Sequence, residues 1–148
     1  NWSGYNPLIG KNQDEYGPRF HDMSDGYHKF YRDQLIETAN KTKQQIFEGI
    51  YCMYSGPNFE TPAEINALKV IGGNAVGMST VPEVLVANHC DLSVIAISVI
   101  TNLAAGMNKT KLSHKETLEN ANLAENNILQ LIKNFITEVT FDDSTGNN

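Results

Sequence analysis

Three short segments of the chain hold the side chains best suited to chemistry. They are residues 55–60, 77–80 and 101–106. Together they supply one carboxylate, one amide, two adjacent hydroxyls and two large apolar side chains, which are Glu60, Asn102, Ser79, Thr80, Phe59 and Met78. Such a set can hydrogen-bond a polar ligand between apolar walls. A helix that starts beside it can bind an anion through its free N–H groups.

Each of these side chains also has a purely structural explanation. Glu60 would suit a solvated loop and Asn102 would suit a turn. Ser79 and Thr80 would suit a helix N-cap, and the two apolar side chains would suit a hydrophobic core. Taken one at a time, these residues therefore do not identify a reaction.

The three segments are expected to follow the carboxyl ends of strands. Apolar and β-branched runs predict strands over residues 46–54, 75–78 and 92–101. Helices are predicted over residues 25–43, 61–72, 80–89 and 113–136, and the last three begin with a Ser/Thr-x-x-Glu capping box. This alternation predicts an α/β fold, with a mixed or parallel sheet flanked by helices. Ligands of such folds bind beyond the carboxyl ends of the strands.

Length and composition restrict the class of protein. A chain of 148 residues predicts one domain over residues 1–148, with an irregular segment at 1–24 and a flexible tail at 142–148. The formal net charge of −6 argues against a nucleic-acid partner. The apolar stretches are too short to span a membrane, and residues 1–5 resemble no signal peptide, so a cytoplasmic location is expected.

Cysteines and histidines give no pattern typical of a metal site. Cys52 and Cys90 lie in apolar stretches, which predicts two buried thiols, with a disulfide or a metal pair as the alternative. The four histidines lack the spacing of a metal-binding motif, and no dinucleotide- or phosphate-binding glycine motif is present. We therefore expect no metal or organic cofactor.

Taken together, five motifs resemble the trimeric, 6-oxopurine-specific purine nucleoside phosphorylases. Residues 56–64 read GPNFETPAE, 75–84 read AVGMSTVPEV and 100–106 read ITNLAAG. The strings NPLIG at residues 6–10 and GPRF at 17–20 also match, in the same order. The resemblance covers residues 1 to about 136 and implies the fold of the second half of such an enzyme. It further implies cleavage of inosine or guanosine by inorganic phosphate, giving the base and ribose 1-phosphate.

The resemblance also implies roles for individual residues. Asn102 would hydrogen-bond purine N7 as the base departs, and Glu60 would accept the N1–H of a 6-oxopurine. Phe59 would pack on base and sugar, and Met78 would lie under the ribose. Ser79 would bind phosphate, and Tyr51 and His114 would contact the ribose. Phe20 would reach into the site of a neighbouring subunit, which implies a homotrimer.

Two differences separate this sequence from the related methylthioadenosine phosphorylases. Those enzymes share the Gly-Met-(Ser/Thr)-Thr-Val-Pro-Glu string, but they lack an acid at the position of Glu60. They also carry Asp where Asn102 stands. The sequence therefore resembles the 6-oxopurine group.

The resemblance covers only the second half of the family's length. The first half of those enzymes carries a glycine-rich phosphate loop and several strands, so an N-terminal half is an expected partner. The chain could be one part of a split enzyme, an inert fragment, or a non-catalytic purine-binding or oligomerisation module. A general α/β interaction domain without a small-molecule site is a further alternative.

Overall fold

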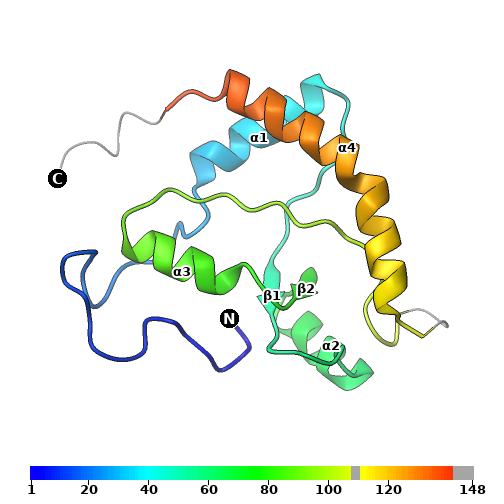
Figure 1. Ribbon diagram of the computed structural model, residues 1–148, viewed down its shortest axis with the longest axis horizontal. Helices are drawn as coiled ribbons and strands as arrows, with labels where there is room; N and C mark the ends of the chain where they lie inside the picture. The colour runs from blue at the N-terminus through cyan, green and yellow to red at the C-terminus, as the bar shows by residue number, and fades with distance from the viewer. Residues whose placement is uncertain (108–110, 142–148) are drawn as a thin grey trace.

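The computed structural model describes residues 1–107 and 111–141 (Figure 1). Its elements follow the order helix, strand, helix, strand, helix, helix. They are α1 (Lys29–Lys41), β1 (Tyr51–Met53), α2 (Pro62–Val70), β2 (Ala75–Gly77), α3 (Val81–His89) and α4 (His114–Glu138). The predicted flexible tail at 142–148 lies outside the described residues.

A two-stranded parallel sheet forms the centre of the fold. Tyr51 pairs with Ala75 and Met53 pairs with Gly77, and α2 makes the crossover between the strands. The N–H of Tyr54 also donates to the carbonyl of Gly77, at 2.8 Å. Because the strands are parallel, the loops that follow them leave from the same edge of the sheet. Helices surround this small sheet, which confirms the predicted α/β class.

The prediction of a buried strand over residues 92–101 is wrong for this structure. The segment is extended, but it pairs with no other strand among the described residues, and Leu92 and Ile100 are 61% and 65% exposed. The strand predicted over 46–54 is likewise reduced to β1. A β-branched sequence favours extended backbone, but a strand also needs a neighbouring backbone to pair with.

Helix starts agree with the sequence in two cases and differ in two. At α2, Thr61 and Glu64 form the predicted reciprocal capping box. At α4, the Ser113 hydroxyl accepts from the N–H of Glu116, at 3.1 Å. The capping box predicted at Thr80 is wrong, because Thr80 has a φ of 75° and its side chain makes no cap bond.

The start of α1 lies later than predicted. The helix begins at Lys29 rather than near residue 25. Asp25 instead accepts the N–H of Lys29, at 3.0 and 3.1 Å, from the turn before the helix. The Asp25 side chain therefore binds a backbone donor that the first helical turn leaves free.

Two small apolar clusters hold the elements together. Leu35, Ala39 and Leu131 join α1 to α4, with Ile46, Ile95 and Phe135 packed against them. Cys52, Ile65 and Leu68 join β1 to α2, with Val76, Ala104 and Ala105 at their border. The two clusters place α1 and α4 on one side of the molecule and α2 under the sheet (Figure 1).

Residues 1–24 are irregular, as predicted, and fold beside α3 and the sheet (Figure 1). The N–H of Trp2 donates to the carbonyl of Met53, at 2.9 Å. Both cysteines are free thiols; Cys52 is buried and Cys90 is half-buried, so the expectation of two buried thiols holds fully for Cys52 only. Within the described residues, the helices are all too short or too polar to cross a bilayer.

Candidate functional site

The loops after β1 and β2 touch each other directly. Gly56 has a φ of 62°, and the Gly56–Pro57 peptide bond is cis. A Cβ on Gly56 would overlap the sulfur of Met78, so a glycine is required where the first loop crosses the second. Met78 and Phe59 are 41% and 38% exposed, which leaves both apolar side chains partly open beside the loops.

The loop at 101–106 meets the same region through α2. A Cβ on Gly106, which has a φ of 79°, would lie 2.8 Å from Cβ of Pro62 at the start of the helix. Ala104 and Ala105 pack against the buried cluster of Cys52, Ile65 and Leu68. The structure therefore brings the three segments singled out in the sequence to one end of β1, β2 and α2.

Glu60 is the buried carboxylate of this region. The residue is only 7% exposed, and its carboxylate has no hydrogen-bond partner in the part of the chain that the structure describes. The Glu60 oxygens are not fully enclosed, so a ligand can reach the carboxylate. A bound donor such as an N–H group would satisfy this carboxylate.

A neighbouring hydrogen-bond network fixes the loop that carries Glu60. Tyr54 donates its hydroxyl proton to Glu64, at 2.5 Å, while the other Glu64 oxygen accepts from the N–H and the hydroxyl of Thr61, at 2.7 and 2.8 Å. The hydrogen bond from Tyr54 and those from Thr61 lower the pKa of Glu64. The same bond to Glu64 raises the pKa of Tyr54. These hydrogen bonds thus tie the two ends of the loop together, at residue 54 and at residues 61–64.

Asn102 is held from α4. Its Nδ2 donates to the hydroxyls of Thr101 and Thr117, at 3.0 and 3.2 Å. Asn120, also on α4, donates to the carbonyl of Thr101, at 2.6 Å. Asn102 is half-buried, and its Oδ1 has no partner among the described residues. The amide is therefore oriented and offers an acceptor.

The turn into α3 carries two hydroxyls and a tyrosine contact. Oγ of Ser79 and Oγ1 of Thr80 lie 3.2 Å apart, and the hydroxyl of Tyr51 accepts from the N–H of Ser79, at 3.3 Å. A Cβ on Gly77 would overlap that tyrosine hydroxyl, so glycine lets Tyr51 reach the turn. A nine-residue helix starts here, and its first N–H groups favour an anion.

Two predicted site residues stand apart from this group. His114 is the first residue of α4 and is exposed, and Phe20 is 90% exposed in the irregular N-terminal segment. Neither is hydrogen-bonded to the three loops within residues 1–107 and 111–141. The sequence analysis did not identify Tyr54 and Thr117 as site residues. Tyr54 bonds to Glu64, 10 positions along the chain, and Thr117 bonds to Asn102, 15 positions before it.

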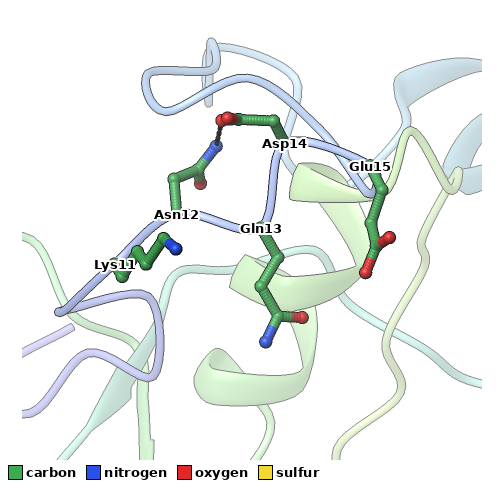
Figure 2. Close-up of a pocket in the computed structure, with 5 residues that line it drawn as sticks. All are labelled: Lys11, Asn12, Gln13, Asp14 and Glu15. Atoms are coloured by element: carbon green, nitrogen blue, oxygen red, sulfur yellow. Dashed lines mark hydrogen bonds between the residues drawn. The ribbon is translucent and has the colours of Figure 1, made fainter.

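A hollow of the described surface lies elsewhere. It is lined by residues 11–15, Lys11 to Glu15, on the irregular segment, where Asn12 donates to Asp14 at 2.6 Å (Figure 2). It is open and polar and contains none of the predicted site residues. In the described part of the chain, no group of three or more His, Cys, Asp or Glu side chains is placed to hold a metal ion.

A comparison with known protein families shows which family the chain belongs to. The profile of the phosphorylase superfamily matches residues 1–137. The chain belongs to the phosphorylase superfamily.

Within this superfamily, similar relatives are purine nucleoside phosphorylases, as the motifs predict. The chain is 45% identical over 130 residues to purine nucleoside phosphorylase 1 of Geobacillus stearothermophilus, covering 88% of this chain and 47% of the relative. It is 40% identical over 149 residues to the Bos taurus enzyme, covering 98% and 52%. This phosphorylase chain thus spans about half the length of the curated relatives that it matches.

Solved structures show the same relationship. The Schistosoma mansoni purine nucleoside phosphorylase in complex with inosine matches with a TM-score of 0.87 and 32% identity, over 91% of this chain and 49% of that chain. A Schistosoma complex with hypoxanthine gives the same TM-score, over 90% and 49%. A further Schistosoma mansoni complex contains adenosine. The predicted fold of a purine nucleoside phosphorylase second half is therefore confirmed.

Proposed function

We propose that this chain carries the purine side of an enzyme that cleaves 6-oxopurine nucleosides with phosphate. The products are the free base and ribose 1-phosphate. The observation that carries the proposal is Glu60, a residue only 7% exposed whose carboxylate makes no hydrogen bond within the described chain, at the junction of three loops. Support comes from relatives named purine nucleoside phosphorylase and from neighbouring structures with inosine and hypoxanthine.

Glu60 selects the base in this proposal. Its carboxylate accepts the N1–H of hypoxanthine or guanine, which pairs a buried acceptor with a donor. Adenine has no N1–H, so the same carboxylate would stay unpaired against it. A site built around such a hydrogen bond rejects an analogue that lacks the donor.

Asn102 stabilises the departing base. Negative charge develops on the purine as the glycosidic bond breaks, and a hydrogen bond at N7 lowers the energy of that state more than the energy of bound substrate. If N7 takes up a proton, Oδ1 of Asn102 accepts the N7–H; if N7 stays unprotonated, the amide must turn and donate. The open Oδ1 favours the first arrangement.

Phosphate and sugar occupy the other side of the loops. Ser79 binds phosphate at the start of α3, where free N–H groups and the helix dipole favour an anion. In this proposal the ribose contacts Tyr51, which accepts from the Ser79 N–H, and His114 at the start of α4, with Met78 beneath it and Phe59 against base and sugar. No cofactor takes part, because phosphate itself is the nucleophile.

The active assembly extends beyond this chain. We propose that the N-terminal half of a phosphorylase domain completes the phosphate site, in a cytoplasmic homotrimer in which Phe20 reaches a neighbouring subunit's site. The 90% exposure of Phe20 supports such a contact. An alternative function is a non-catalytic purine-binding or oligomerisation module, which binds a purine without phosphate-dependent turnover.

Base release from a panel of nucleosides tests the proposal. The chain is co-expressed with the first half of the Geobacillus stearothermophilus relative, and the purified complex is incubated with inosine, guanosine or adenosine, with and without phosphate. We expect phosphate-dependent release of hypoxanthine and guanine and little release of adenine. Equal release from adenosine would contradict the role of Glu60, and binding without turnover would favour the non-catalytic module.

A further inference from the structure

One buried histidine joins the end of α3 to the irregular N-terminal segment. His89, the last residue of α3, is 5% exposed, and its Nε2 lies 3.0 Å from Oδ1 of Asn12. Nδ2 of Asn12 already donates to Asp14, at 2.6 Å, and to the carbonyl of Gly17, at 3.0 Å (Figure 2). Because both amide hydrogens of Asn12 are used in this way, its Oδ1 is the acceptor and Nε2–H of His89 is the donor.

Two further contacts of His89 lie on either side of Phe20 in the sequence. A Cβ on Gly17 would lie 1.8 Å from the carbonyl oxygen of His89, so this close approach requires a glycine. The ring of His21 meets the ring of His89 edge-on, with the ring centroids 5.6 Å apart. Phe20 itself is 90% exposed. His89 therefore fixes the backbone just before and just after a side chain that the fold leaves open.

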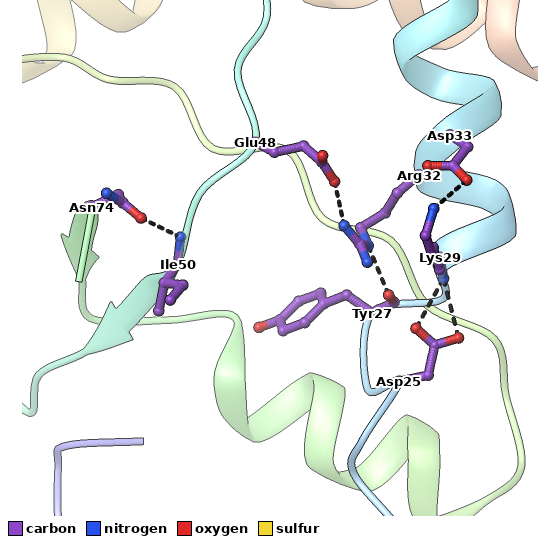
Figure 3. A network of polar contacts seen from close by, with 8 residues as sticks. All are labelled: Asp25, Tyr27, Lys29, Arg32, Asp33, Glu48, Ile50 and Asn74. Carbon is purple, nitrogen blue, oxygen red and sulfur yellow. Dashed lines mark hydrogen bonds and ion pairs between the residues drawn. The ribbon is translucent and has the colours of Figure 1, made fainter. Parts of the chain in front are cut away.

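The far end of the same segment is fixed by α3 and by α1. Nδ2 of Asn88, in the last turn of α3, donates to the carbonyl of Gly26, at 2.9 Å. Nε of Arg32 on α1 donates to the carbonyl of Tyr27, also at 2.9 Å (Figure 3). Residues 12–27 are therefore tied to the helices at both ends, as well as at the middle.

We propose that His89 is a positioning residue, which holds residues 12–21 so that Phe20 is presented to the active site of a neighbouring subunit. This inference rests on the proposed function and its homotrimer. A side chain that forms a wall of another subunit's site works best when its own subunit already orders it, because ordering on binding costs conformational entropy. His89 supplies this order from within its own subunit. Its loss should therefore impair the neighbour's site rather than its own.

Three substitutions disturb these contacts in different ways, and we call them the anchor variants. His89→Leu removes the donor, Asn12→Ala removes the acceptor, and Gly17→Ala places a methyl group against the carbonyl oxygen of His89. Two control variants accompany them. His89→Gln keeps a side-chain N–H donor, and Asn40→Ala changes an exposed asparagine on α1. All of these positions lie outside the proposed purine and phosphate site.

Amide hydrogen exchange of this chain by itself tests whether His89 holds the segment. The N–H of Tyr16 donates to the carbonyl of Gln13, at 3.0 Å, and reports on the segment. We expect its exchange to become at least about threefold faster in the anchor variants and to stay unchanged in the two control variants. The N–H of Val84 within α3 should keep its rate throughout, which shows that the helix stays folded. An unchanged Tyr16 rate in all anchor variants would overturn the inference.

Inosine turnover by assembled enzymes tests whether the effect reaches a neighbouring subunit. The chain and its variants are assembled with the first half of the Geobacillus stearothermophilus relative and assayed with phosphate. We expect His89→Leu to lower kcat/KM at least about fivefold and His89→Gln to stay within about twofold of the wild type. In a Phe20→Ala background, His89→Leu should cause little further loss, because the side chain that it positions is already absent.

Mixed assemblies separate action on a neighbour from action within one subunit. His89→Leu subunits are assembled with an excess of Asn102→Ala subunits, which keep His89 and Phe20 but lack an effective site of their own. Most sites of the His89→Leu subunits then border an intact segment. We expect turnover per His89→Leu subunit to rise to within about twofold of the wild type.

Two outcomes of the turnover measurements have distinct meanings. Turnover per His89→Leu subunit that stays low in the mixed assemblies would overturn the inference, because His89 would then act on the site of its own subunit through α3. A wild-type assembly without turnover would contradict the proposed function, and the exchange rate of Tyr16 would still decide whether His89 holds the segment.

Discussion

At the scale of single residues, the proposed function divides binding and catalysis between Glu60 and Asn102. Glu60 is buried on the loop after β1, and Asn102 is held by two threonine hydroxyls. The first recognises a group that is present on the base throughout the reaction. The second acts on charge that appears only as the bond breaks, so substitutions at the two positions should have different kinetic signatures.

For Asn102→Ala we expect a loss of turnover of about a hundredfold or more in the complete enzyme, with a smaller change in nucleoside binding. The lost hydrogen bond acts mainly in the transition state. Steady-state kinetics with inosine measures kcat and KM separately. Asn134→Ala, at a half-buried position on α4 where the side chain accepts from Gln130, is the control. Near-normal turnover of Asn102→Ala would exclude the leaving-group role.

For Glu60→Ala we expect inosine activity to be lost, because N1–H of the base then has no acceptor. The readout is hypoxanthine release by the complete enzyme at saturating phosphate. Glu119→Ala, on the exposed face of α4 beside Lys115, should keep normal activity. Survival of inosine turnover in Glu60→Ala would show that another group recognises the base.

The sequence alone predicted which residue types meet at this site, and for a physical reason. Glu60 and Ser79 follow the paired strands β1 and β2, and parallel strands bring such positions to one edge. Asn102 follows an apolar run that forms no strand here, and its loop packs against the start of α2 instead. The contacts that orient them could not be predicted. Tyr54 reaches Glu64 and Asn102 reaches Thr117 through side-chain directions that depend on how α2 and α4 pack.

At the scale of elements, α2 is the helix that positions the site. Thr61 and Glu64 cap it, and Tyr54 joins that cap to the end of β1. The hydrogen bonds from Tyr54 and Thr61 lower the pKa of Glu64 below its ordinary value of 4.5. The carboxylate form is therefore the one that stabilises the start of α2.

Replacing Glu64 should make the free energy of unfolding of the chain less dependent on pH in the acidic range. Because the pKa of Glu64 is lower in the folded chain, its contribution is present above pH 4.5 and is lost as the pH falls through the folded value. We expect Glu64→Gln to reduce the free energy of unfolding at pH 7, and this deficit to shrink below pH 4.5. Urea denaturation across this pH range measures both. A deficit that is the same at every pH would contradict the role of the charge.

Strand predictions failed where the described residues supply no pairing partner. Helices close their own hydrogen bonds, so the bounds of α2 and α3 lie close to those predicted, although only α2 has the predicted cap. Strands need a second backbone, and residues 92–101 lack one here despite their β-branched sequence. Thr80 failed as a cap for a local reason, since its φ of 75° turns the chain sharply before α3.

At the scale of the whole molecule, the chain presents a large exposed apolar surface. Phe20 and Ile9 in the irregular N-terminal segment are 90% and 76% exposed, and Phe47 and Ile100 are 83% and 65% exposed. Surfaces of this kind mark contacts with other polypeptides. In the proposed assembly, Phe20 contacts a neighbouring subunit.

We expect Phe20→Ala to lower kcat/KM for inosine in the assembled enzyme while leaving the melting temperature of this chain unchanged. The Phe20 side chain is almost fully exposed within the chain, so its removal affects only the contact with the neighbouring subunit's site. Ile9→Ala, an exposed position in the same segment, is the matched control. Equal kinetics for wild type and Phe20→Ala in an assembly of confirmed trimeric mass would contradict the contact.

The central claim, that phosphate is the nucleophile that cleaves the nucleoside, is tested most directly by phosphorus NMR. The complex of this chain with the first half of the Geobacillus stearothermophilus relative is incubated with inosine and inorganic phosphate. We predict a new sugar-phosphate signal for ribose 1-phosphate that grows in equal amount with hypoxanthine. Release of hypoxanthine with free ribose, or a folded complex with no reaction at all, would contradict the account.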